Sequence, residues 1–318
     1  MLNLFFYMLP SNLRNLNNVD SIGSFYGDFP YPSAPLVKEA PTPFEMKWCY
    51  KSALLFTGII KLEKDIPKPL KILDAGCGTG VSTNYLAYQN LNSQILAIDI
   101  SSNSLKIAMD RVSLSSANKL STIKFRNQSI FDLKVNKYFH FINSVGMLQH
   151  LKNPESGLLA LDSFLRPGGI MCISVYAEKG RVHINSLKSI FRKLGLSANT
   201  KDIKLAKNMI LNLPINNILR NDHERRLFNG YMSDDYFADL YLNPREINFS
   251  LEMLFKMIES TSLVFGGFTN DSLWELKPFL QGELLRRAMK LSRREQLELI
   301  QDLSHEINHF EFFLVKPL

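Results

Sequence analysis

The sequence predicts an α/β fold, in which a seven-stranded and mostly parallel sheet is covered by helices on both faces. Short apolar runs alternate with helical patterns between residues 70 and 176, and this order favours a parallel sheet. A glycine-rich turn joins the first apolar run to the first helix of that series. With 318 residues, 46% of them hydrophobic, the chain can bury a core of this size as one domain with a sizeable insertion.

The predicted elements begin after an N-terminal arm. Residues 10–44 are rich in Asn, Pro, Gly and Ser, which indicates an irregular segment, and residues 45–64 have helical apolar spacing that ends before Pro67. Pro167-Gly168-Gly169 predicts a turn ahead of the fifth strand. Right-handed crossovers between the parallel strands determine the topology. Strands are expected at residues 70–74, 94–98, 122–126, 138–145 and 170–176, with helices at residues 81–89, 104–115 and 154–165.

The pattern changes after the fifth strand. Residues 180–260 have a mainly helical pattern, and residues 263–269 and 309–315 predict two further strands. Ser292 followed by Glu295 is a capping-box pattern, so a helix is expected to begin there. We therefore divide the chain into an arm (residues 1–44), a core (45–176), a helical insertion after the fifth strand (177–260) and a C-terminal completion of the sheet (261–318).

Cysteine content and hydrophobicity restrict the class of protein. The three cysteines, Cys49, Cys77 and Cys172, are widely spaced and form no CxxC pair. Neither a disulfide framework nor a zinc site is indicated, and a reducing, cytoplasmic setting is expected. Met1 to Leu9 is apolar but lacks the positive region and cleavage site of a signal peptide. The later apolar runs fall far short of the roughly 20 residues that a membrane span needs.

The net charge of +7 is concentrated in one segment. Residues 181–226 contain ten Lys or Arg and three Asp or Glu, an excess of +7 that equals that of the whole chain. This basic segment could attract an acidic substrate, a phosphate or a nucleic acid. The alternative is that these residues form a solvated helical face, which is the more common case in a sequence rich in Lys and Asn.

The glycine-rich turn reads Asp74-Ala75-Gly76-Cys77-Gly78-Thr79-Gly80. Glycine lets the backbone adopt positive φ and lets a ligand approach closely. The helix that follows presents free N–H groups, which suit a carboxylate or a phosphate. Asp99 ends the second strand, 25 residues after Asp74, where a carboxylate can accept hydrogen bonds from both hydroxyls of a ribose.

Two details separate this turn from that of a dinucleotide-binding enzyme. Its spacing is GxGxG rather than GxGxxG. The first strand ends in Asp74, whose charge would repel a pyrophosphate but attract an ammonium or a sulfonium. A methionine moiety carries both an ammonium and a carboxylate, so it would suit the acid and the glycine turn together. A nicotinamide dehydrogenase is therefore disfavoured.

The motifs of this region resemble those of class I S-adenosylmethionine-dependent methyltransferases. DAGCGTG resembles their first motif, AIDIS (residues 97–101) their second, NSVGMLQHL (143–151) the segment after the fourth strand, and LRPGGIMCISVY (165–176) the motif around the fifth. The resemblance implies a Rossmann-like sheet and S-adenosyl-L-methionine as cofactor. The residues that it implies for cofactor binding are Asp74, Gly76, Cys77, Gly78, Gly80, Asp99, Ile100, Ser129, Ile130 and Ser144.

The chain also departs from this family. Many relatives carry an acid near the adenine amino group where this chain has Ser129, and two histidines where it has Gln149-His150. The hydroxyl of Ser129 can still make one hydrogen bond there. The flanks resemble a narrower group of bacterial methyltransferases, some fused to tetratricopeptide repeats, through YGDFPYP (residues 26–32) and DLYLNP (239–244). Asn243 stands where that group has histidine.

Methyl transfer from a sulfonium is an in-line displacement, for which the protein mainly supplies position and a dry site. A base is needed only where the nucleophile must lose a proton. His150 is the leading candidate because it follows the fourth strand, at the edge where open α/β sheets bind ligands, although it could instead orient the next helix. Tyr176 could contact the acceptor or pack in the core. Cys77 is more typical of a packing residue than of a nucleophile, and no metal site is indicated.

Three functions are compatible with the sequence. The first is a methyltransferase for a small-molecule acceptor, with residues 177–260 as a lid over the substrate. The second acts on nucleic acid or protein through the basic segment, although the sequence lacks the Asp/Asn-Pro-Pro-aromatic motif of DNA and RNA amino-methyltransferases. The third is a protein that binds the cofactor without turnover. No membrane partner is expected, and neither the acceptor atom nor the oligomeric state follows from the sequence.

Overall fold

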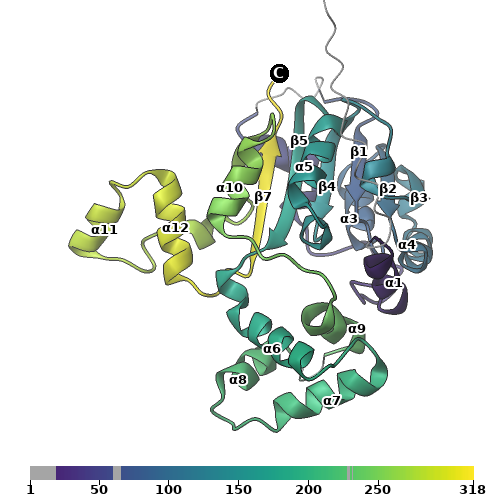
Figure 1. Ribbon diagram of the computed structural model, residues 1–318. Helices are drawn as coiled ribbons and strands as arrows, with labels where there is room; N and C mark the ends of the chain where they lie inside the picture. Colours follow the sequence, from purple (N-terminus) through teal and green to yellow (C-terminus); the bar gives the residue numbers. More distant parts are fainter. Residues whose placement is uncertain (1–18, 60–65, 228–229, 231) are drawn as a thin grey trace, which may run out of the picture.

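The structure, a computed structural model, describes residues 19–59, 66–227, 230 and 232–318 (Figure 1). Among these residues, seven strands form one sheet in the order β3-β2-β1-β4-β5-β7-β6. Strands β1 to β5 are parallel, and β7 is antiparallel to both of its neighbours. The predicted fold class is thereby confirmed. The strands are β1 (Lys71–Ala75), β2 (Gln94–Asp99), β3 (Thr122–Asn127), β4 (Phe139–Val145), β5 (Leu165–Tyr176), β6 (Val264–Phe268) and β7 (His309–Val315).

Helices cover both faces of the sheet, as the alternating pattern predicted. On one face, Ile72 of the sheet and Leu86 of the helical layer are completely buried in a shared core. On the other face, Leu73 and Leu158 are buried in the same way. Burying such a side chain contributes about 1.5–3 kcal/mol. The first layer comprises α2 (Tyr50–Phe56), α3 (Val81–Gln89) and α4 (Ser102–Leu114), and the second α5 (Pro154–Phe164) and α10 (Leu251–Glu259).

Side-chain caps account for several helix boundaries. Ser101 caps α4 by accepting a hydrogen bond from the backbone N–H of Ser104, and Asn153 caps α5 in the same way. Ser292 and Glu295 form the predicted capping box at the start of α12 (Arg293–Leu303). Each cap satisfies a backbone donor that would otherwise lack a partner, a contribution of about 1 kcal/mol.

Two predictions of local structure are wrong. The Pro-Gly-Gly segment is not a separate turn, because β5 begins at Leu165 and its register against β4 shifts between Phe139 and Phe141. The segment is thus an irregular part of the strand, and its two glycines exchange backbone hydrogen bonds with Lys316. The arm is not irregular throughout, because Val19–Asp28 forms α1. Ile22 and Phe25 of α1 are buried and three residues apart, so they lie on one helical face.

The helix expected over residues 45–64 is shorter than predicted. A 3₁₀ turn, η3 (Met46–Trp48), is followed by α2, which ends at Phe56. Thr57 ends α2 by directing its hydroxyl back to the carbonyl of Ala53, a side-chain contact that competes with continued helix. The last residues of the predicted range, 60–64, lie outside the described part of the chain, as does the apolar N-terminal segment.

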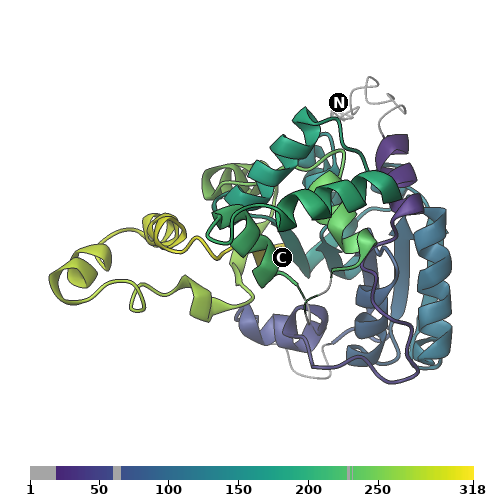
Figure 2. The ribbon, with the colours of Figure 1, turned by 90° about the horizontal axis from the view of Figure 1, so that it is seen from below.

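Beyond the carboxyl ends of the parallel strands, the chain after β5 forms a group of helices around a second core, to which Phe25 of α1 also contributes (Figure 1). Phe191, Phe237 and Tyr241 are buried at its centre. Viewed from below, this group lies across the strand ends beside α1 (Figure 2). The group comprises α6 (Val182–Lys193), α7 (Thr200–Leu211), α8 (Ile218–Arg225), α9 (Asp234–Phe237) and the π-helix η9 (Ala238–Leu242).

Two segments complete the molecule after this group. Residues 243–250 return to the sheet, where the N–H of Phe249 donates to the carbonyl of Tyr176. Helices α11 (Gly282–Ala288) and α12 project away from the sheet (Figures 1 and 2). In the described ranges, none of the helices has the length and apolar character required to cross a membrane.

Candidate cofactor and acceptor site

The glycine turn lies between the carboxyl end of β1 and α3. Gly76, Gly78 and Gly80 have φ values of 76°, 51° and 81°, which glycine adopts without strain. A Cβ atom on Gly76 would lie 2.6 Å from Cγ of Met147, and one on Gly78 would lie 2.5 Å from the carbonyl oxygen of Tyr31. The space above the turn is therefore bounded by the loop after β4 and by the N-terminal arm.

The backbone N–H groups of this turn are bonded within the chain. Those of Gly76 and Cys77 donate to the carbonyl of Ile98, and that of Gly78 donates to Oδ2 of Asp99 at 2.9 Å. The next two N–H groups, at residues 79 and 80, donate to the carbonyls of residues 31 and 77. The N–H groups of the turn itself are therefore satisfied within the chain, so the predicted free N–H groups are those that begin α3 (Val81–Gln89).

Asp74, at the end of β1, is completely buried. Its carboxylate accepts hydrogen bonds from the hydroxyls of Ser82 and Thr83 at the start of α3, and from the amide of Asn143 on β4. Burial raises the pKa of Asp74, and these three hydrogen bonds oppose the rise. The carboxylate thus joins β1, β4 and α3, and the expected contact with a ligand's ammonium stays a prediction.

Asp99, at the end of β2, is placed differently. Its Oδ2 accepts from Gly78 and its Oδ1 accepts from the backbone N–H of Ser101 at 2.8 Å. Each oxygen keeps a second lone pair, so Asp99 can still accept hydrogen bonds from ribose hydroxyls. Burial raises the pKa of Asp99, while the backbone hydrogen bonds oppose the rise.

The other expected cofactor residues surround this edge of the sheet. Ile100 is half-buried beneath α1, where a Cβ on Gly23 would contact it at 3.8 Å. Ser129 accepts from the backbone N–H of the residue two positions on, and Ile130 is buried in the core. Ser144 is completely buried on β4.

Cys77 is 3% exposed and packs against Ala97 and Leu105. Burial raises the pKa of its thiol well above the ordinary value. Since the thiolate is the reactive form of cysteine, these contacts favour a packing role, as the sequence suggested. Within the described residues, no group of three or more His, Cys, Asp or Glu side chains could hold a metal ion.

The N-terminal arm also contributes a side chain to the site, through Tyr26. The carbonyl of Tyr26 in α1 accepts from the hydroxyls of Ser101 and Ser104, which fixes the arm to the start of α4. The hydroxyl of Tyr26 donates to Oδ1 of Asp239 at 2.7 Å and lies 3.0 Å from Nε2 of His150. Tyr26 therefore connects the cofactor edge with the helical insertion.

His150 is buried at the carboxyl edge of the sheet, in the 3₁₀ turn η7 (Leu148–His150). Its Nδ1 lies 2.9 Å from the carbonyl oxygen of Arg245, so Nδ1 carries the proton of the neutral ring. Burial lowers the pKa of His150, and the nearby charge of Asp239 opposes this effect. A neutral ring leaves Nε2 able to accept a proton.

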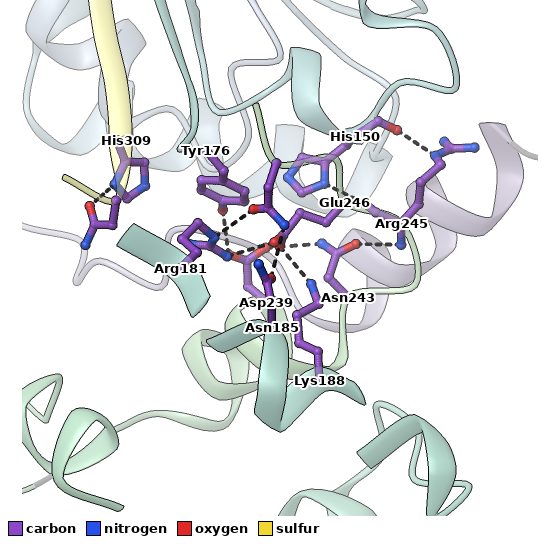
Figure 3. A network of polar contacts seen from close by, with 12 residues as sticks. His150, Tyr176, Arg181, Asn185, Lys188, Asp239, Asn243, Arg245, Glu246 and His309 are labelled. Atoms are coloured by element: carbon purple, nitrogen blue, oxygen red, sulfur yellow. Dashed lines mark hydrogen bonds and ion pairs between the residues drawn. The ribbon is translucent and has the colours of Figure 1, made fainter. Parts of the chain in front are cut away.

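Tyr176 ends β5 beside His150, with the two rings edge to face at 6.0 Å between centroids. Its hydroxyl lies 3.5 Å from Oδ2 of Asp239. Figure 3 shows both rings projecting from the sheet edge toward residues of the insertion. The structure thus brings together His150, Tyr176 and Asp239, which come from η7, β5 and η9, and adds Tyr26 and Asn243 to them.

A buried ion network borders this cluster. The carboxylate of Glu246 contacts the guanidinium of Arg181 at 3.0 Å and the ammonium of Lys188 at 2.8 Å (Figure 3). Burial favours the protonated form of Glu246, but the two cations more than offset it, so the pKa of Glu246 is lowered. The guanidinium also stacks on the ring of Tyr176 at 3.7 Å, which ties the insertion to β5.

Tyr26 is the functional candidate that sequence reasoning missed. It lies 124 residues from His150 and 213 from Asp239 along the chain, and no local pattern indicates contacts at such separations. The only available signal was YGDFPYP itself, whose first residue is Tyr26. That motif indicated a resemblance but assigned no role to the tyrosine.

The sheet order, the glycine turn and Asp99 define a protein of the nucleoside-binding α/β class. Comparison with known proteins gives the family. Residues 66–222 match the sequence model of a family described as a methyltransferase domain. An uncharacterized protein of Synechococcus sp. is 37% identical over 317 residues, which are 98% of this chain and 73% of that protein.

Two further comparisons concern a named enzyme and a solved structure that contains a ligand. Malonyl-[acyl-carrier protein] O-methyltransferase 2 of Ilyobacter polytropus is 29% identical over 137 residues, 43% of this chain and 51% of that enzyme. The structure of PKMT2 from Rickettsia typhi in complex with AdoHcy has the same fold, with a TM-score of 0.67 and 18% identity over 86% of this chain. Our chain spans 54% of that protein, about half of its length.

The chain belongs to the class I S-adenosylmethionine-dependent methyltransferases, and its cofactor is S-adenosyl-L-methionine. The residues present suit this cofactor. Asp99 keeps lone pairs for the ribose, the glycine turn has the positive φ values that allow close approach, and the buried hydroxyl of Ser144 lies at the neighbouring strand end without a hydrogen-bond partner among the described residues.

Proposed function

We propose that the protein methylates a small-molecule acceptor that must lose a proton, and that His150 is the general base. The observation that carries this proposal is the buried cluster of Tyr26, His150, Tyr176 and Asp239 at the carboxyl ends of β4 and β5. Tyr26 belongs to α1 and Asp239 to η9, so these two elements would enclose an acceptor bound beside the strand ends. Enclosure excludes water and holds the nucleophile in line with the methyl group.

The bound cofactor supplies an electrophilic methyl group, and the chain's own residues position it and move the proton. Asp99 would hold the ribose, with Ile100, Ser129 and Ile130 near the adenine. The hydroxyl of Tyr26 lies 2.7 Å from Asp239 and 3.0 Å from Nε2 of His150, so it can turn its proton from one to the other. An acceptor hydroxyl would give its proton to the Tyr26 oxygen as the Tyr26 proton moves to Nε2.

The surrounding charges suit this role for His150. Burial raises the pKa of Tyr26 well above its ordinary value, so Tyr26 remains a neutral relay rather than a phenolate. Asp239 stabilises the imidazolium that forms after proton transfer, as a carboxylate near a catalytic histidine does. Tyr176 would form one wall of the acceptor space, with its ring held by the Arg181 guanidinium.

The alternative of a nucleic-acid or protein substrate depends on the basic segment, and more than half of its cations are held in ion pairs. Of the ten cationic side chains in residues 181–226, six form ion pairs with acids. Two of these cations are buried against Glu246 and cannot face a polyanion. The six are Arg181, Lys188, Lys207, Arg220, Arg225 and Arg226.

We also propose that the four-part division of the chain reflects its function. Residues 45–176 would bind the cofactor, residues 177–260 would form the lid, the arm would close the site through Tyr26, and residues 261–318 complete the sheet. The lid is supported by the core that α6 to η9 form together with Phe25 of α1. Its last helix, α10, packs on the sheet and would stay in place when the lid moves.

The test uses donor labelled in its methyl group, a cellular extract, and separation of small molecules from nucleic acid and protein. We expect label in a small molecule with the wild type. His150→Gln should lose this transfer while it retains S-adenosylhomocysteine binding, and His183→Gln on α6 should behave as wild type. Label in the macromolecular fraction would favour the alternative substrate, and the absence of transfer from every fraction would favour a non-catalytic protein.

A further inference from the structure

Two buried side chains at the carboxyl end of β4 have polar atoms without hydrogen-bond partners in the described part of the chain. They are Ser144, through Oγ, and Gln149, through both Nε2 and Oε1. Both residues are completely buried. Polar groups in protein interiors are almost always hydrogen-bonded, because burial removes their contacts with water. Two such side chains at one strand end therefore indicate a missing partner.

Their position is next to the glycine turn. Gln149 lies in η7, and a Cβ on Gly146 would lie 3.6 Å from its Nε2. In the same loop, Met147 covers Gly76. Ser144 follows Asn143, which pairs with β1 and donates to the carboxylate at the end of that strand. The orphan groups thus lie at the end of the cofactor site where the amino-acid portion of S-adenosylmethionine is expected.

The N–H groups of the glycine turn and the carboxylate that ends β1, which border this position, are already bonded. Each backbone N–H from residue 76 to residue 80 has an acceptor within the chain. The carboxylate of Asp74 has three donors of its own, two of which are the hydroxyls of Ser82 and Thr83 in the first turn of α3. The N-terminal end of α3, where the helix dipole is positive, therefore already lies next to the Asp74 carboxylate. The carboxylate of a ligand would be repelled there by the charge of Asp74.

We propose that Gln149 and Ser144 bind the amino-acid end of S-adenosylmethionine. Nε2 of Gln149 and the hydroxyl of Ser144 donate to the carboxylate of the ligand, and Oε1 of Gln149 accepts from its ammonium. A primary amide suits this pair of charges because it presents donors and an acceptor in one plane. The inference rests on the cofactor that the family uses, and it does not depend on the acceptor or on the role of His150.

The experiment is a pair of calorimetric titrations with the full chain. One ligand is S-adenosylhomocysteine, and the other is 5′-methylthioadenosine, which keeps the adenosine and the sulfur but has no amino-acid end. Gln149→Met removes both polar atoms at similar length. We expect it to weaken S-adenosylhomocysteine about tenfold or more, because hydrogen bonds to charged groups are lost, and to leave methylthioadenosine affinity unchanged. Ser144→Ala should act in the same direction with a smaller effect.

Gln301→Met is a matched control, because Gln301 on α12 is also buried with an unpartnered Nε2. It should leave both affinities unchanged. The proposal is overturned if Gln149→Met weakens the two ligands equally, or if S-adenosylhomocysteine affinity stays at the wild-type value. If that variant does not fold, Ser144→Ala decides by the same criterion. A wild type that fails to bind S-adenosylhomocysteine would instead contradict the cofactor assignment.

Discussion

The substitution Glu246→Gln tests what holds the insertion against the sheet. Glu246 and Arg181 have side chains 2% exposed, and Lys188 is 10% exposed. The change keeps the shape of the side chain but leaves two buried cations without a counter-charge. Removing one partner of a buried ion pair costs about 3–5 kcal/mol, so the free energy of unfolding should fall by about that amount.

The assay is equilibrium unfolding in urea, followed by far-ultraviolet circular dichroism and by hydrogen exchange of α6. Glu252→Gln is the control, because Glu252 pairs with Lys256 at 2.8 Å on the surface, where both side chains are about two-thirds exposed. Surface pairs contribute about 0–1 kcal/mol. If Glu246→Gln costs no more than Glu252→Gln, or if α6 keeps its protection, the network does not secure the insertion and the reasoning is wrong.

Three further predictions concern the cofactor edge and the base. Gly78→Ala should destabilise the protein by more than Gly282→Ala and should expose the N-terminal arm to protease. Both residues have positive φ, but of the two only Gly78 would place its new Cβ against a backbone carbonyl, that of Tyr31. If both variants lose about 1 kcal/mol of unfolding free energy, the cost of the left-handed backbone alone, the contact with Tyr31 does not matter. Asp99→Asn should weaken S-adenosylhomocysteine about tenfold or more by calorimetry, and unchanged affinity would remove the ribose contact. The pKa of His150 is lowered from its ordinary 6.5, so His150 is neutral and able to act as a base at pH 7. The value of kcat/KM should therefore be constant near pH 7 and fall as the pH drops through a value below 6.5, where His150 becomes protonated. If the residual activity of His150→Gln shows the same fall, His150 is not its origin.

Much of the cofactor half of the site could be predicted because its determinants are local. Gly76, Gly78 and Gly80 lie in one turn, and Asp99 ends the next strand, so strand order and spacing place them at one edge. The positions of β2, α3 and β7 follow from short apolar runs and periodicity in the same way. The Pro-Gly-Gly segment of β5 was predicted as a turn because only its backbone hydrogen bonds to the distant Lys316 show that it belongs to the strand.

Partners within the site could not be predicted in the same way. Asp74 was expected to attract a ligand's ammonium, which stays a prediction, and its hydrogen bonds to Ser82, Thr83 and Asn143 were not foreseen. Two of these partners are within nine residues of Asp74, but nothing in the sequence states which way a carboxylate turns. The basic segment was similarly ambiguous until Glu246, twenty residues beyond its end, was found between Arg181 and Lys188.

The sequence by itself determined the class of fold, the succession of strands and helices along the chain, and the edge where a cofactor is expected, because periodicity, turn chemistry and parallel crossovers act over short stretches of chain. Only the tertiary structure decided which hydrogen-bond donors and acceptors are bonded within the protein and which remain available to a ligand. Tyr26 contacts His150 and Asp239, whereas the side-chain amide of Gln149 has no hydrogen-bond partner among the described residues. Such outcomes depend on how distant segments pack, and hydrogen-bond satisfaction is a property of that packing rather than of any segment alone.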